Sequence, residues 1–150
     1  MVDIYEYLKL DHEKVAKLFK LYDTAPSEKN KLEIVAMLNK ELTVHAISEE
    51  ETFYKVLERH RESKKEALHG EKEHQEIKDK LAEIIQIKHA NPTLDAKVKK
   101  LKEIVEHHVS EEEGKIFKEA KDVLSKEMAL AIKEQMHYLK GKLLLNYFPD

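Results

Sequence analysis

The sequence predicts an all-α protein, an antiparallel up-and-down four-helix bundle with a short fifth helix at its C-terminal end. The first reason is composition, because 38% of the 150 residues are charged and only three are glycine and three proline, a balance that favours long helices over sheet. The second reason is that apolar residues recur at helical spacing in long segments with short connections, which is typical of antiparallel neighbours in a bundle. A chain of this length can bury a core as one unit, so we expect a single domain over residues 1–150.

The first two helices are expected at about 3–22 and about 28–59. In the first, apolar residues flank His12 at helical spacing, and the segment 23–27 then supplies turn chemistry and a helix-capping serine. In the second, the apolar stripe contains His45, and one turn later a glutamate lies where a core residue belongs. Each of these helices therefore carries a chemically active side chain on its inward face.

The remaining helices are expected at about 64–89, about 94–121 and about 125–145. The third carries His74 on its apolar face and stops before a break at Pro92, since proline both ends a helix and suits the start of the next. The bundle would thus occupy about 3–121, and the C-terminal helix would pack on it.

The sequence also contains a repeated pattern of histidine and glutamate. A histidine is followed four residues later by a glutamate in two places, and this spacing puts both side chains on one helix face, one turn apart. Each pair is preceded by a lone histidine at a similar distance. The six residues of the pattern are His12, His45, Glu49, His74, His108 and Glu112.

A bound cation would explain why these residues lie on apolar stripes. A single histidine on such a stripe is usually a hydrogen-bonded core residue, but two glutamates buried without partners would cost several kcal/mol, on the order of a domain's whole stability margin. Because the chain has no cysteine, any metal must be held by nitrogen and oxygen. Imidazoles and carboxylates suit first-row metals, and a carboxylate can bridge two ions roughly 3.5 to 4 Å apart.

This pattern resembles the hemerythrin-like proteins, the HHE cation-binding domain family, over about residues 4–120. The resemblance implies a non-haem di-iron centre with two Fe ions, oxo- or hydroxo-bridged. It implies that four histidines act as terminal ligands and two glutamates as bridges, namely His12, His45, His74 and His108 with Glu49 and Glu112.

The chain departs from the oxygen-carrying members of that family at one position. Those members have a further histidine four residues before the one that matches His74, and this chain has Gly70 there, which is expected to leave open space beside the site. His69 could compensate, although its side chain points about 100° away around the helix. His107 is an alternative to His108, but helical phase favours His108.

Some neighbouring residues have smaller expected roles. Glu50, Glu111 and Glu113 are expected to be solvated or to accept the second N–H of a ligand imidazole. Tyr54, one turn beyond the glutamate, is expected in the core, with its hydroxyl as a further candidate for the metal pocket.

Charge and hydropathy limit the partners. The net charge is −3 and basic and acidic residues are interspersed, which gives no electrostatic footprint for nucleic acid or membrane. The first six residues carry acids where a signal peptide needs bases. We therefore expect a cytoplasmic protein with neither kind of partner.

The function expected from the resemblance is binding or reduction of a small molecule such as O2, peroxide or NO at the di-iron centre. This includes a peroxide- or O2-reducing oxidoreductase. An iron-responsive sensor or binding module and a reversible oxygen carrier are the alternatives.

Overall fold

The computed structural model describes residues 1–148, and within them every regular element is helical. The all-α prediction is therefore confirmed. The elements are α1 (Ile4–Asp23), α2 (Glu28–Glu49), η1 (Glu50–Tyr54), α3 (Lys55–Leu57), α4 (Lys64–Ile84), α5 (Pro92–Glu111), η2 (Glu112–Ile116), α6 (Phe117–Val123) and α7 (Lys126–Tyr147).

Four of the helices begin at a side-chain cap. The side chains of Asp3, Ser27, Asn91 and Ser125 each accept a hydrogen bond from the backbone amide three residues later, which satisfies one of the free N–H groups of a helix start. Pro92 follows its cap directly, in the position where proline costs no hydrogen bond. Local chemistry thus sets these starts.

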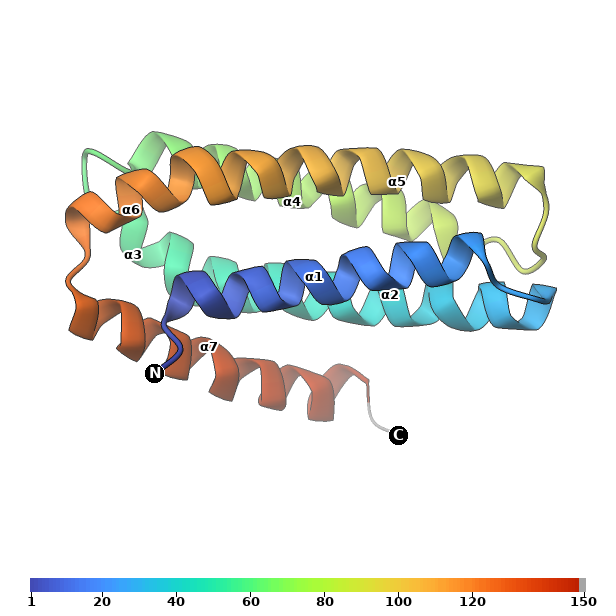
Figure 1. The fold of residues 1–150 in the computed structure, drawn as a ribbon, viewed down its shortest axis with the longest axis horizontal. Helices are drawn as coiled ribbons and strands as arrows, with labels where there is room; N and C mark the ends of the chain where they lie inside the picture. Colours follow the sequence, from blue (N-terminus) through green and yellow to red (C-terminus); the bar gives the residue numbers. More distant parts are fainter. Residues whose placement is uncertain (149–150) are drawn as a thin grey trace.

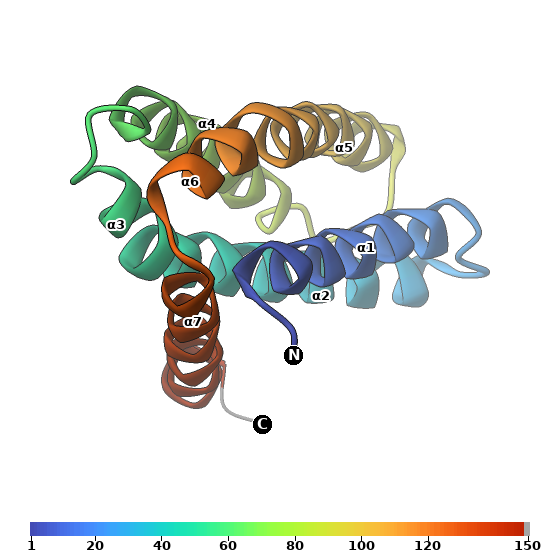
Figure 2. The same ribbon diagram turned by 60° about the vertical axis from the view of Figure 1, so that its left-hand side comes forward.

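The four long helices α1, α2, α4 and α5 lie side by side (Figure 1). α1 packs on α2 and α4 on α5, while α2 also contacts α4. α7 lies outside them against α1 and α2 (Figure 2). In residues 1–148 no helix has both the length and the apolarity needed to cross a membrane.

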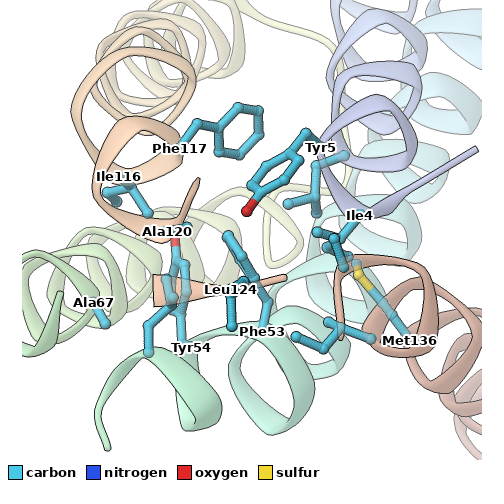
Figure 3. Packing of buried hydrophobic residues seen from close by; sticks show 14 residues of the cluster. Ile4, Tyr5, Phe53, Tyr54, Ala67, Ile116, Phe117, Ala120, Leu124 and Met136 are labelled. Atoms are coloured by element: carbon cyan, nitrogen blue, oxygen red, sulfur yellow. The ribbon is translucent and has the colours of Figure 1, made fainter. Parts of the chain in front are cut away.

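Two hydrophobic clusters form the core, one toward each end of the long helices. Figure 3 shows the first, in which Tyr5, Phe53 and Phe117 pack together near Met136 of α7. The second lies around the α1–α2 and α4–α5 connections. On α1, Leu8 belongs to the first cluster and Val15 to the second, so the residues between them lie where the two clusters meet.

The structure corrects three expectations about the helices. The third helix ends at Ile84 and not at 89, because the chain must turn there to reach the cap of α5. No glycine or proline near residue 84 marks this end in the sequence. The fifth helix is not short, since it has 22 residues. The second and fourth helices each contain a π-helical turn, which helical periodicity does not reveal.

Candidate metal centre

The six residues of the repeated pattern come together in the interior, between the two hydrophobic clusters. Glu49 and Glu112 are fully buried, and His45, His74 and His108 are 6%, 1% and 3% exposed. The side chain of His12 is 8% exposed. The side chains come from α1, α2, α4, α5 and the start of η2.

Each glutamate lies between two imidazoles from different helices. Oε1 of Glu49 is 3.4 Å from Nε2 of His45 and 3.0 Å from Nε2 of His74. Oε1 of Glu112 is 3.1 Å from Nε2 of His12, and its Oε2 is 3.6 Å from Nε2 of His108. Each carboxylate is therefore close enough to two imidazoles to share a bound cation with either of them.

Two overlapping groups have ligand atoms within 4.8 Å of one another. One contains Glu49, His74, His108 and Glu112, and the other contains His12, His45 and Glu112. Because Glu112 belongs to both groups, two ions held there would share a ligand.

The atoms that face the middle of this cluster have no hydrogen-bond partner among the described residues. They are Nε2 of all four histidines, both carboxylate oxygens of Glu49 and Oε1 of Glu112. The contacts above are close, but their geometry is not that of hydrogen bonds. Since buried polar atoms are nearly always paired, this set of converging lone pairs fits a cation.

The other nitrogen of each imidazole is paired with a carboxylate. Nδ1 of His45 is 2.8 Å from Asp11, and Nδ1 of His12 is 2.7 Å from Glu113. A carboxylate that accepts the Nδ1–H fixes the tautomer and leaves Nε2 free to ligate.

The second half repeats this arrangement. Nδ1 of His74 is 2.9 Å from Glu50, and Nδ1 of His108 is 2.8 Å from Glu73. From the sequence, Glu50 and Glu113 were expected as candidates for such a role, but Asp11 and Glu73 were not. The signal that could have found these two is an acidic residue directly before each lone histidine.

A π-helical turn follows the ligand region in both halves. η1 begins directly after Glu49, and η2 begins at Glu112. Single π-helical turns inside α-helices occur frequently at functional sites. The internal repeat therefore extends to the backbone.

Tyr54 fills the space that Gly70 was expected to leave open, so that expectation is wrong. Its ring stacks on His74 with centroids 5.2 Å apart, and its hydroxyl donates a hydrogen bond to Oε2 of Glu112. A Cβ added at Gly70 would lie 2.7 Å from the Tyr54 hydroxyl oxygen. Glycine at this position thus makes room for the tyrosine ring.

Charges in the cluster change the pKa of its groups. Burial alone would lower the pKa of His45, but Glu49 and Asp11 outweigh it and raise the pKa to about 10. Burial likewise opposes the protonation of His74, yet Glu49 and Glu50 raise its pKa to about 9. Without a cation, protons therefore balance the buried carboxylates.

A small cavity of about 20 Å³ lies beside the imidazoles, with apolar walls that include Val15, Leu42, Ile77 and Val105. It has room for roughly one water-sized molecule. The two other histidines considered as ligands, His69 and His107, lie outside the cluster with side chains 47% and 67% exposed.

Comparison with known proteins gives three findings. The family model of the Hemerythrin HHE cation binding domain matches residues 3–120. A DNA nickase from Nostoc sp. is 31% identical over 127 residues, which are 84% of this chain and 36% of that protein, so the chain spans about a third of its length. The crystal structure of a Hemerythrin HHE cation binding domain-containing protein from Mycobacterium kansasii aligns with a TM-score of 0.80 at 22% identity, covering 100% of this chain and 96% of that one, and has the same fold.

Proposed function

The chain belongs to the hemerythrin HHE cation-binding family, and from that premise we propose that it holds two non-haem iron ions and binds or reduces a small molecule such as O2, peroxide or NO. Glu49 and Glu112 would bridge the ions. His12, His45, His74 and His108 would complete the ligand set. We also propose that the chain acts as one domain, an antiparallel up-and-down bundle with α7 as its covering helix.

One observation carries this proposal: each imidazole has its Nδ1 paired with a carboxylate, while its Nε2 has no hydrogen-bond partner among the described residues and faces a buried glutamate. This is the hydrogen-bonding pattern of metal-ligating histidines, whose second nitrogen is fixed by an acceptor. A mixed set of imidazole and carboxylate ligands suits iron better than Mg²⁺ or Ca²⁺, which prefer oxygen ligands alone.

The residues around the centre define what reaches it. Iron, when bound, supplies the one-electron redox chemistry that the side chains lack. The apolar walls at Val15 and Ile77 and the small cavity limit entry to small molecules and exclude bulk water. Tyr54 holds its proton at Oε2 of Glu112, because burial raises its pKa well above the usual value.

The first test measures metal content and reactivity. The purified protein is expected to contain two irons per chain by elemental analysis. The reduced protein, mixed with oxygenated buffer in a stopped-flow instrument, is expected to oxidise in a way that removal of O2 does not reverse, because four imidazoles serve two ions and the oxygen carriers of the family have five. A fully reversible optical change would instead make oxygen carriage the function, and a protein isolated with no bound metal would contradict the iron site.

The pH dependence of stability should have opposite signs in the metal-free and iron-loaded proteins. The raised pKa of His45, about 10, gives the metal-free protein stability that is complete below the unfolded value near 6.5 and is lost as pH rises. Urea unfolding of the metal-free protein should therefore give a lower free energy of unfolding at pH 9 than at pH 7. Iron needs neutral imidazole, so the free energy of unfolding of the iron-loaded protein should rise over the same pH range. If stability changed equally with pH in both forms, the assignment of these histidines as iron ligands would be contradicted. His45→Gln should make the stability of the metal-free protein depend less on pH.

A further inference from the structure

A second group of histidines and carboxylates lies on the outer surface between α4 and α5, apart from the buried centre. It consists of His69 and Glu73 on α4 and His107 and Glu111 on α5. Each histidine is one turn from the glutamate of its own helix, so the two share a face. The Glu73 side chain is 7% exposed, whereas Glu111 is 37% exposed. One carboxylate of the group is therefore buried and the other is open to solvent.

The donor atoms of this surface group already converge. Nε2 of His69 is 3.4 Å from Oε2 of Glu73 and 3.1 Å from Oε2 of Glu111, and the ligand atoms of these three residues lie within 4.8 Å of one another. Nε2 of His107 is 3.5 Å from Oε2 of Glu73 and 3.1 Å from Oε1 of Glu111. Two ligands of a tetrahedral Zn²⁺, at bonds of about 2.0–2.1 Å, are about 3.3 Å apart. The four imidazole–carboxylate separations are close to this value.

We propose that His69, Glu73 and Glu111, with His107 as the fourth ligand, bind one divalent first-row transition-metal ion such as Zn²⁺, in addition to the buried centre. Two imidazoles and two carboxylates are a ligand set for such an ion. The carboxylates balance the charge of the ion. Surface ion pairs stabilise a fold only slightly, so stability alone does not account for the meeting of four such side chains.

Glu73 joins the surface site to the buried centre. Its Oε1 is 2.8 Å from Nδ1 of His108, while its Oε2 faces the surface histidines. A change at Glu73 would therefore disturb both sites. Among the described residues, His69 and His107 form ion pairs with Glu73 and Glu111 and with no residue of the buried ligand set. Variants at these two positions therefore separate the surface site from the buried one.

The experiment is a titration of the iron-loaded full chain with Co²⁺. Binding is monitored by calorimetry and by the visible absorption of four-coordinate cobalt. The wild-type protein is expected to bind one Co²⁺ per chain at the surface, and Zn²⁺ is expected to displace it. His69→Ala should bind this ion at least ten-fold more weakly, and His107→Ala should weaken it as well. His89→Ala is the matched control, because the His89 side chain is 84% exposed and its ion-pair partner is Glu28, which lies outside the surface group.

Iron content and circular dichroism of His69→Ala should equal those of the wild type. If both histidine variants bound Co²⁺ with wild-type stoichiometry and affinity, the surface site would be refuted. If the buried centre took no iron, His69→Ala would still bind the surface cobalt at least ten-fold more weakly than the wild type, so failure of the di-iron proposal is distinguishable from failure of this one.

Discussion

Replacing Glu49 with alanine is expected to empty the centre of both irons, with a loss in affinity of more than about 100-fold. The carboxylate of Glu49 lies 3.4 Å from Nε2 of His45 and 3.0 Å from Nε2 of His74, so each proposed ion depends on it. Even partners that only orient a ligand contribute about 10–100-fold to metal affinity, and a shared ligand should contribute more. Glu112→Ala is expected to have the same effect, because Glu112 belongs to both ligand groups.

Elemental analysis after gel filtration measures this loss. Glu51→Ala is the control, since the Glu51 side chain is 61% exposed two residues along the chain and pairs only with Lys55 among the described residues. Alanine leaves His45 and His74 without their buried counter-charge, which lowers the stability of the metal-free fold. Glu49→Gln keeps the side-chain shape and tests the charge alone. A Glu49 variant that retained two tightly bound irons would refute the bridging assignment.

The buried cluster was predictable from the sequence because a helix repeats every 3.6 residues. His45 and Glu49 lie one turn apart on an otherwise apolar stripe, and a buried carboxylate demands a partner. The same reasoning applies to His108 and Glu112. These side chains meet in the structure because the stripes face the common interior.

The groups that orient the imidazoles were less predictable, since they depend on contacts between helices. Asp11 is adjacent in sequence to His12 but pairs with His45, and Glu113 pairs with His12 across the bundle. Periodicity assigns a residue to a face but does not say which neighbouring helix supplies its partner. The π-helical turns have no sequence signal of their own, although the core position expected for Tyr54 is the one it has.

The role of glycine at position 70 could be found only from packing. An absent side chain can mean either an open space or a space that another residue fills, and sequence alone does not distinguish the two. Here the Tyr54 side chain occupies it, with its hydroxyl oxygen and two ring carbons within 2.8 Å of the Cβ position. The space next to Gly70 is therefore filled by a side chain whose hydroxyl donates a hydrogen bond to Glu112.

Adding a side chain at Gly70 is expected to destabilise the protein. This is the opposite of the usual result, because replacing a glycine in a helix interior with alanine ordinarily stabilises a protein by about 0.5–1 kcal/mol. Gly70→Ala must displace a buried ring, and such overpacking costs typically about 1–3 kcal/mol. Gly141→Ala is the matched control, because Gly141 also lies within a helix and has nothing within 4 Å of its Cβ position. Urea unfolding of the metal-free variants should show a loss for the first and a gain for the second.

The cause of the loss is tested with Gly70→His and Tyr54→Ala, singly and together. Each single variant should be destabilised, Tyr54→Ala by about 3–5 kcal/mol as for other large buried rings. In the double variant the imidazole can enter the space that the tyrosine ring leaves, so the combined loss should be smaller than the sum of the single losses by at least about 1 kcal/mol, within the range measured for contacting residues. Only the double variant is then expected to offer a fifth imidazole to the iron centre, seen as a change in its visible spectrum. If the losses were additive, or if Gly70→Ala were as well tolerated as Gly141→Ala, the Tyr54 ring would not be what requires glycine at position 70.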